Sequence, residues 1–383
     1  MGRWFATLVF AAALTFALRV DAREPAVRNG FAVEVPVLPM SVKVHGQQLV
    51  SYEIHLTNFS SDRLEISRIA VLDARNGQPV IRLSGDALAA ATAVVGGAAA
   101  KPGERKFIDP GQRAVVFMDF TVPLGSLKGA IRHEIDYAVV STGATSTISA
   151  GPLSLDRHKP SLIAPPLRGG PWVAIHSAAW PRGHRRVFYA VAGRARLPGR
   201  FAIDWVKVDG NGRTTGGDPD IASEAYGYGD DVLAVADASV AAVRDGMDEP
   251  LKISQRTAHL PAEDAGNYVT LRLPDGRFAF YEHLRKGSIR VHAGDKVTTG
   301  QVLGSLGFSG ESTGPHLHFH VADGDSPLDA EGVPFEIRSF RQLGRYDDIS
   351  KLGSSRAPAQ GAAVRENEWP DANAVVDFSA AAR

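Results

Sequence analysis

Three histidines at alternate positions near the C-terminal end are the feature that most constrains how this chain can fold. The run at 314–320 reads GPHLHFH, so imidazoles stand at His316, His318 and His320. Alternate side chains of a β-strand point to the same face, so in a strand all three would project together. Clustered imidazoles make a poor hydrophobic core and a good metal site. The run therefore predicts a β-strand that carries part of a metal site.

The overall composition is that of a globular protein and limits the ligands that such a site can use. The 383 residues are 44% hydrophobic and 22% charged, which is enough for two or three domains with cores of their own. The 42 Lys and Arg balance the 42 Asp and Glu, so the chain lacks the basic field of a typical nucleic-acid binder. There is no cysteine, so any metal must be held by His, Asp or Glu.

The N-terminus has the pattern of a signal peptide and predicts export. Arg3 precedes an apolar run, Trp4–Leu18, and Val20–Ala22 gives small residues at cleavage spacing before Arg23. The alternative is an uncleaved anchor, but the run is shorter than the ~20 residues that a membrane span needs. We expect residues 1–22 to be removed, leaving a periplasmic or secreted protein with no membrane insertion.

Residues 23–155 predict a first β domain. Ser51–Thr57 alternates polar and apolar residues, and turn pairs such as Asn76-Gly77 and Pro110-Gly111 separate runs of this kind. Many short strands at this spacing favour an immunoglobulin-like β-sandwich. No cluster of catalytic residues stands out here, so we interpret the domain as a binding, spacing or covering module.

The remainder predicts a linker, a second β domain and a tail. Residues 156–170 hold three prolines and a closing Gly pair, which favours an extended linker. Runs typical of β-strands return in residues 171–345. Residues 346–383 are rich in Ala, Ser and Gly, which predicts a disordered or loosely held tail. The predicted fold class is all-β, with a sandwich followed by a domain built on an antiparallel sheet.

An ordered set of motifs in the second domain resembles the lysostaphin-type (LytM-like) zinc metallopeptidases. Gly307–Gly310 followed by Ser312–Phe319 is similar to the terminal motif of that family. Upstream, Phe201–Trp205, Asp231–Asp237 and Tyr281–Leu284 resemble further strands of the family in the expected order. The pair H-x-H alone is a weak signal, but the ordered set is a specific one.

The resemblance implies a peptidase that holds zinc with a His, an Asp and the second His of the H-x-H pair. A water would occupy the open fourth position. By motif position, Asp204 and His318 would be ligands, while His283 and His316 would be the catalytic histidines beside the water and the developing oxyanion. Zinc lowers the pKa of bound water to about 7, and an imidazole of similar pKa can take or return the proton.

The chain departs from the family pattern at the first ligand. The usual position, four residues before Asp204, holds Arg200, whose guanidinium stays protonated and cannot ligate zinc. His184 lies in a turn farther upstream, and a branch of the family resembles this arrangement. The predicted ligand set is therefore His184, Asp204 and His318.

Other polar residues near these motifs leave alternatives open. His320, on the same strand face as His318, and His176, in the strand before the turn, are the other candidates for the first ligand. Because the family often has Glu at the position of His320, we interpret this residue as packing or hydrogen bonding behind a ligand. Arg185 and Arg200 are interpreted as ion-pairing, substrate-contacting or solvated surface residues.

Two functions compete at this point. The first is an exported zinc metalloendopeptidase that cleaves peptide bonds of peptidoglycan. The second is a catalytically degenerate module that binds the cell wall or activates other wall hydrolases, and Arg200 favours it. The retention of Asp204, His283, His316 and His318 argues against it, since a dead site has no chemical need for four such residues.

Overall fold

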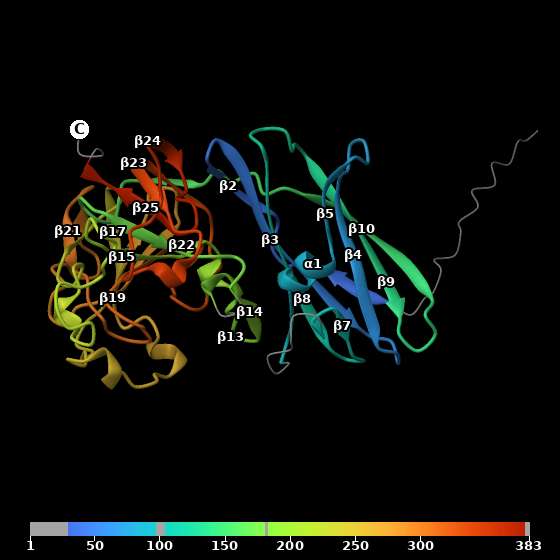
Figure 1. The fold of residues 1–383 in the computed structure, drawn as a ribbon, viewed down its shortest axis with the longest axis horizontal. Helices are drawn as coiled ribbons and strands as arrows, with labels where there is room; N and C mark the ends of the chain where they lie inside the picture. Colours follow the sequence, from blue (N-terminus) through green and yellow to red (C-terminus); the bar gives the residue numbers. More distant parts are fainter. Residues whose placement is uncertain (1–29, 97–103, 181–182, 380–383) are drawn as a thin grey trace, which may run out of the picture.

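The computed structural model describes residues 30–96, 104–180 and 183–379, and these residues form two β-rich domains that lie side by side (Figure 1). Within them the only α-helix is α1 (Gly85–Ala91), and the other helical elements are short 3-10 turns. The predicted all-β fold class is thus confirmed. The predicted signal peptide, residues 1–22, lies outside the described residues.

The N-terminal domain consists of two five-stranded sheets. The pairs within each sheet are antiparallel. Ile54 and Leu56 from one sheet and Ile69 and Val71 from the other are fully buried in one cluster, as expected for the core of a sandwich. The first sheet contains β1 (Phe31–Glu34), β3 (Gln47–Asn58), β8 (Arg113–Pro123) and β6 (Thr92–Val94), with β2 (Met40–Val44) paired to β3. The second contains β10 (Thr145–Ser154), β9 (Ala130–Val139), β4 (Leu64–Asp73) and β5 (Pro79–Ser84), with β7 (Phe107–Ile108) paired to β4.

Strand β3 is buried on both faces, although its polar and apolar residues alternate as in a strand with one solvent-exposed face. Ser51, Glu53 and His55 alternate with the core residues, yet they are only 2%, 2% and 6% exposed. Phe117 on the neighbouring strand β8 is also buried, at 4% exposed. The outer face of this sheet is therefore covered, and the C-terminal domain supplies the cover.

The C-terminal domain is built on an eleven-stranded sheet that is antiparallel except at one edge, where β11 runs parallel to β23. At its centre β15 (Ile203–Lys207), β22 (Leu317–Ala322) and β19 (Phe278–Leu284) lie next to one another. The order from one edge to β15 is β11 (Ser161–Ile163), β23 (Phe335–Arg345), β25 (Ala374–Asp377) and β12 (Trp172–Ile175), with β24 (Ala359–Glu368) paired to β23. Beyond β19 follow β18 (Asn267–Arg272), β17 (Ala238–Arg244) and β20 (Lys296–Val297).

Two small sheets flank this large one. β16 (Asp231–Leu233) pairs with β21 (Val302–Ser305), and β13 (Tyr189–Val191) pairs with β14 (Arg194–Arg196). In Figure 1 the β13–β14 hairpin lies on the side of the C-terminal domain that faces the sandwich. The chain segment around this hairpin is thus the part of the domain from which contacts to the sandwich are expected.

The structure differs from the expected linker and tail. Ser161–Ile163, inside the predicted linker, forms β11. The predicted tail adds β24 and β25 to the sheet, and β25 occupies a place between β12 and β23. The reason is packing: Trp369, Val376 and Phe378 are buried in the main core of the domain. The prediction of a loose tail relied on the Ala-rich composition of this stretch and overlooked the few apolar residues that reach the core.

The two domains share buried apolar surface through β2. Its residues Met40, Val42 and Val44 belong to the same buried cluster as Phe340 and Trp369 of the C-terminal domain. The backbone N–H of Trp369 also donates to the carbonyl of Lys43 at 2.8 Å. In Figure 1 β2 leans toward β24 and away from the rest of the sandwich. The interface between the two domains is therefore a continuation of the core of the C-terminal domain.

Among the described residues, none of the helices combines the length and the apolar character that a membrane crossing requires.

Candidate metal centre

Two adjacent strands bring an aspartate and a histidine together. Asp204 on β15 is paired directly with His318 on β22, so the two side chains share one face of the sheet. The Oδ1 atom of Asp204 lies 2.9 Å from Nδ1 of His318. Cross-strand register thus explains the proximity of residues 114 positions apart.

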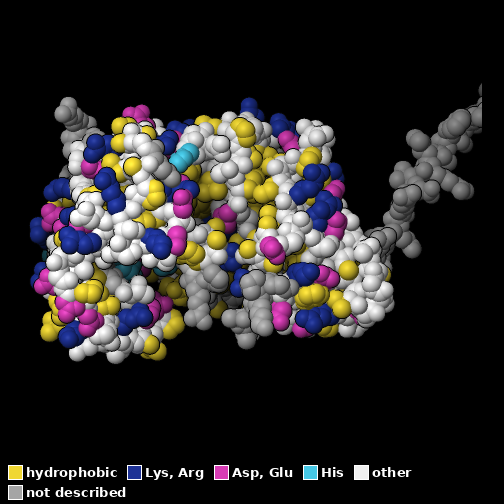
Figure 2. Space-filling view, viewed as in Figure 1, with side chains coloured by type: hydrophobic (Ala, Val, Ile, Leu, Met, Phe, Trp, Pro, Cys, Tyr) yellow, Lys and Arg dark blue, Asp and Glu magenta, His cyan; other side chains and the backbone are white. Residues whose placement is uncertain are grey.

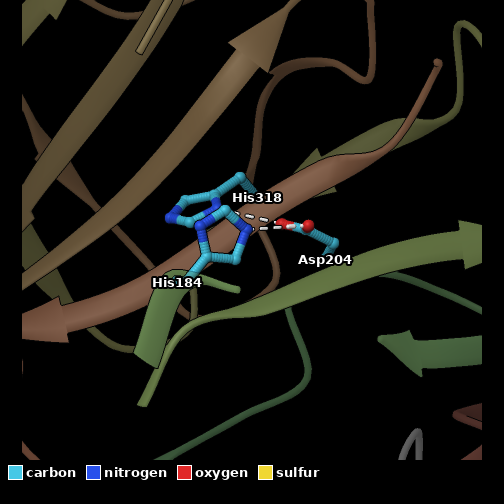
Figure 3. A group of neighbouring side chains, drawn as sticks. All are labelled: His184, Asp204 and His318. Atoms are coloured by element: carbon cyan, nitrogen blue, oxygen red, sulfur yellow. Dashed lines mark hydrogen bonds and ion pairs between the residues drawn. The ribbon is translucent and has the colours of Figure 1, made fainter. Parts of the chain in front are cut away.

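The third member is His184, which comes from a short 3-10 turn, η2 (His184–Arg186). Its Nε2 atom lies 2.8 Å from Oδ2 of Asp204. Figure 3 shows the rings of His184 and His318 on the same side of the Asp204 carboxylate, with one ring nitrogen of each directed at it. One donor atom from each residue lies within 4.8 Å of the others, a spacing that could hold a metal ion. We call these three residues the His–Asp–His cluster.

His184 rests on a second 3-10 turn, η3 (Pro198–Phe201), at Gly199. A Cβ atom added to Gly199 would lie 2.8 Å from the Cβ of His184, so a larger residue there would push His184 out of place. The next residue, Arg200, is also in η3, because β15 begins only at Ile203. Position 200 therefore does not share the strand face of Asp204, and the Arg200 side chain is buried elsewhere, at 1% exposed.

A β-bulge places His283 beside the cluster. Between the pairs Asn267–Leu284 and Val269–Tyr281 the register shifts by one residue, which leaves one extra residue on β19. His283 in this bulge has φ of 63°, in the left-handed region that non-glycine residues rarely adopt. Such local strain is typical of functional positions. The bulge interrupts the strict alternation of β19 and changes the direction of the His283 side chain.

Backbone carbonyls set the tautomers of His283 and His316. Nδ1–H of His283 donates to the carbonyl of Ser309 at 2.8 Å, and Nδ1–H of His316 donates to that of Gly314 at 2.7 Å. In the neutral form each ring therefore keeps an unprotonated Nε2. Nε2 of His316 lies 3.4 Å from Oδ1 of Asp204, and the two imidazole rings are 4.8 Å apart. Both imidazoles can accept a proton next to the His–Asp–His cluster.

Burial and neighbouring charges tune this group. Burial acts to raise the pKa of Asp204, but the facing imidazoles of His184 and His316 outweigh it and hold that pKa well below its usual range. Burial, with His184 adding to it, lowers the pKa of His318 to about 4. Burial, aided by His316 and His318, also holds the pKa of His283 well below its usual value. Near neutral pH the cluster therefore offers the carboxylate of Asp204 and the neutral imidazole of His318, the forms that bind metals.

His320 and Glu282 lie behind His318. Nε2 of His318, the ring nitrogen away from Asp204, is 3.1 Å from Nδ1 of His320. Glu282 pairs with His318 across the strands, and its Oε1 lies 3.9 Å from Nδ1 of His320. Within the described residues this Oε1 and Nε2 of His320 are buried without a hydrogen-bond partner. Burial, with Asp204 adding to it, raises the pKa of Glu282 to about 8.

The other candidate ligands lie outside the His–Asp–His cluster. His318 lies between His320 and Asp204, and His320 forms with Glu282 and His318 a second group of donor atoms within 4.8 Å of one another that could hold a metal. His176 donates from Nε2 to the carbonyl of Pro370 at 3.0 Å, and its ring lies 4.1 Å from the centre of the Trp369 ring at a tilt of 37°. It takes no part in the His–Asp–His cluster.

The cluster opens into a pocket of about 410 Å³ that both domains line. His184 is the open side of the cluster, since its side chain is 40% exposed whereas that of His318 is 7% exposed. Ser51 and Asp119 of the sandwich line the pocket together with Trp180 of the C-terminal domain. Figure 2 shows the surface hollowed between the two domains.

Sequence reasoning missed two parts of this site. Glu282 was not singled out, although an acidic residue inside the apolar strand sequence FAFYEHL was an available signal. The residues of the sandwich that line the pocket gave no signal, because their place depends on the arrangement of the two domains.

Comparisons with known proteins support the resemblance. Residues 220–330 match Peptidase family M23. The peptidoglycan DD-endopeptidase ShyA of Vibrio cholerae is 41% identical over 66 residues, which is 17% of this chain and 15% of ShyA. The peptidoglycan DD-endopeptidase ShyC of the same organism is 33% identical over 91 residues, which is 24% of this chain and 19% of ShyC. The chain thus matches less than a quarter of the length of each of these curated relatives.

A solved structure resembles a larger part of the chain. The catalytic domain of the antimicrobial peptidase lysostaphin from Staphylococcus simulans is 19% identical, covers 43% of this chain and 88% of that chain, and has a TM-score of 0.24. The family match contains His283, His316 and His318 and begins after His184 and Asp204. The sequence match to the family, together with the named relatives, identifies residues 220–330 as a Peptidase family M23 domain, of the metallopeptidase type that the motifs predicted.

Proposed function

We propose that this protein is an exported zinc metalloendopeptidase that cleaves peptide bonds of peptidoglycan. The observation that carries the proposal is the meeting of His184, Asp204 and His318, each with one donor atom directed at the others. Two imidazoles and one carboxylate form the three-ligand set that catalytic zinc uses, with one position left for water. The pocket provides the access that a substrate needs.

The residues around the cluster fit hydrolysis of a peptide bond. Bound zinc would supply an activated water near neutral pH and polarise the scissile carbonyl. His316, whose free Nε2 lies beside Asp204, is placed to take a proton from the attacking water and to return it to the leaving amine. His283, whose Nε2 is unprotonated because its Nδ1–H is held by the carbonyl of Ser309, would accept a hydrogen bond from the attacking water and orient it.

The substrate class rests on the relatives. ShyA and ShyC are both named peptidoglycan DD-endopeptidases. These names state an endopeptidase action on peptidoglycan, and we propose the same substrate class for this chain. The wall lies outside the cytoplasm, so the substrate agrees with the predicted signal peptide and with a periplasmic or secreted location.

The competing proposal is a catalytically degenerate module that binds the wall or activates other hydrolases. It was favoured by Arg200 at the usual ligand position. The position of His184 next to Asp204 weakens that argument, because a replacement ligand is at hand. The two proposals differ in one measurable property, which is the binding of a catalytic metal.

Metal analysis of the chain from Arg23 onward, purified with zinc present, tests the proposal. We expect about one zinc per chain, and release of peptide fragments from purified peptidoglycan, followed by chromatography and mass spectrometry. The His184→Ala variant should lose both. His292→Ala is the matched control, since the His292 side chain is 91% exposed. A wild-type chain that binds no zinc would refute the peptidase and leave the degenerate module.

A further inference from the structure

The residue after His184 is held by the other domain. In the described part of the chain, each hydrogen-bond partner of the Arg185 side chain belongs to the sandwich. Its Nη1 donates to Glu53, its Nη2 donates to the carbonyl of Tyr52 at 3.1 Å, and its Nε donates to Oδ1 of Asp119 at 3.2 Å. The side chain is only 6% exposed. A turn that carries a candidate metal ligand is therefore fixed from outside its own domain.

The residues that follow Arg185 also lie on the sandwich. Arg186 donates from Nη2 to the carbonyl of Ala90 at 2.8 Å, and its guanidinium lies 4.9 Å from the centre of the Phe117 ring. The Phe188 ring lies 5.8 Å from His55 and 6.1 Å from Phe117. Residues 185–188 thus cover the outer face of β3 and β8, which explains why that face is buried.

Glu53 joins the two turns on which the position of His184 depends. One turn is η2, held through Arg185, and the other is η3, on which His184 rests at Gly199. Arg200 of η3 donates from Nε to Oε1 of Glu53 at 3.1 Å and from Nη2 to Oε2 at 2.9 Å. Arg200 also pairs with Glu331 at 2.9 Å. We call Glu53, Asp119, Arg185, Arg200 and Glu331 the ion-pair cluster.

The ion-pair cluster is suited to transmit position because Glu53 and its two arginine partners, Arg185 and Arg200, are buried and bonded to one another. The Glu53 side chain is 3% exposed and that of Arg200 is 1% exposed, so neither can exchange its partner for water. Hydrogen bonds to guanidinium groups are directional, and a carboxylate shared by two of them fixes both. The apolar residues of β2 are buried in the core of the C-terminal domain, which adds a second attachment between the two domains.

We infer that the N-terminal sandwich sets the position of the first metal ligand, with Glu53 and Asp119 as positioning residues that act on His184 through Arg185. The inference rests on the proposed function only in taking His184 as a metal ligand. On this inference the sandwich takes part in building the metal site. Arg200, which stands where the family usually has its first ligand, belongs to the same interface.

Zinc affinity in the absence of substrate tests this inference. We expect Arg185→Met to weaken zinc binding at least tenfold, measured by competition with a chromophoric chelator well below the unfolding temperature. Arg68→Met is the matched control, because Arg68 pairs with Asp136 and Glu134 in the second sheet of the sandwich, whereas Arg185 of η2 bonds to residues of the first sheet. Arg68→Met should bind zinc like the wild type.

Asp119→Asn is the milder variant, which keeps the shape of the side chain and removes one charge that faces Arg185. We expect it to weaken zinc binding by a smaller factor and to alter the visible absorption spectrum of the Co²⁺-loaded protein, which reports ligand number and geometry. Arg185→Lys should restore part of the affinity lost in Arg185→Met.

The outcomes separate the inference from the proposed function. If the wild type binds zinc while Arg185→Met and Asp119→Asn bind it with unchanged affinity and unchanged Co²⁺ spectra, the inference is overturned and the peptidase stands. If the wild type binds no zinc, both fall together. If Arg185→Met does not fold, the Asp119→Asn affinity and spectrum decide.

Discussion

The His–Asp–His cluster and the ion-pair cluster meet at consecutive residues, His184 and Arg185. They differ in how their polar groups are paired and in how far they are open to solvent. In the ion-pair cluster each guanidinium faces a carboxylate, and the side chains of Glu53, Arg185 and Arg200 are at most 6% exposed. In the His–Asp–His cluster Asp204 faces several imidazoles, and one side stays open to a pocket. A buried polar group that is fully paired stabilises one geometry, whereas a group of donors that face a common point can take up a ligand. The polar residues of one interface thus fall into two groups: the ion-pair cluster fixes the geometry, and the His–Asp–His cluster is open to a ligand.

Removal of Asp204 should have the largest effect, because both imidazoles of the His–Asp–His cluster are oriented toward its carboxylate. We expect Asp204→Asn to lose zinc and to reduce peptidoglycan hydrolysis to background. The measurement is metal content together with release of wall peptides. Asp248→Asn serves as the control, since Asp248 is an exposed aspartate with an 87% exposed side chain. Hydrolysis by a zinc-free Asp204→Asn protein would show that the cluster is not the reactive centre.

Removal of Glu53 tests the other half of the comparison. Glu53→Ala leaves Arg185 and Arg200 without their shared carboxylate, and breaking a buried ion pair costs about 3–5 kcal/mol of stability. We expect a clearly lower midpoint of denaturant unfolding. Glu65→Ala, which removes the partly exposed pair of Glu65 with Lys106, should cost at most about 1 kcal/mol. Equal losses of stability in the two variants would mean that the buried cluster contributes no more to stability than an exposed ion pair.

A residue behind the metal ligands should have an intermediate effect. His320→Ala removes the ring that faces Nε2 of His318, so His318 loses the contact that orients it. Loss of such an outer contact typically weakens metal affinity about 10–100-fold. Chelator competition measures the change, and His320→Asn, which keeps an acceptor, should recover part of it. Wild-type affinity in His320→Ala would place the orienting contact elsewhere.

The smallest effect concerns acid stability. Burial acts to raise the pKa of Glu53, but Arg200 and Arg185 outweigh it and lower this pKa from 4.5 to about 2. A carboxyl with a lowered folded-state pKa contributes stability above its unfolded pKa, and this contribution is lost as the pH falls through about 2. The wild type should therefore lose stability between about pH 4.5 and 2 more steeply than Glu53→Gln, as followed by thermal melts. Parallel curves for the two proteins would contradict the lowered pKa.

The parts of the site that follow from strand register could be predicted from the sequence. Asp204 and His318 lie in short motifs on strands, and alternation fixes the faces to which they point. His184 was harder, because it lies in a 3-10 turn where no periodicity applies. The bulge that directs His283 into the site is a local irregularity without a pattern of its own.

Interdomain features could not be predicted from the sequence. The alternation in β3 indicates one polar face, but it does not say whether water or another domain covers that face. Arg200 was interpreted as an ion-pairing, substrate-contacting or surface residue, and the sequence did not name its partner, Glu53, which lies 147 residues away in the chain. The prediction of a loose tail was wrong for a related reason, since β25 pairs with β12 and β23, strands far from it in the sequence.

The position of β25 also has a consequence for biosynthesis. The strand β12, next to the β15 strand that carries Asp204, receives its second neighbour only when residues 374–377 have been made. Until then β12 has an unpaired edge, and such edges invite association with other chains. The sheet that supports the site is therefore completed only after β25 has been made, and chains that stop before residue 374 should aggregate more readily than chains that include β25.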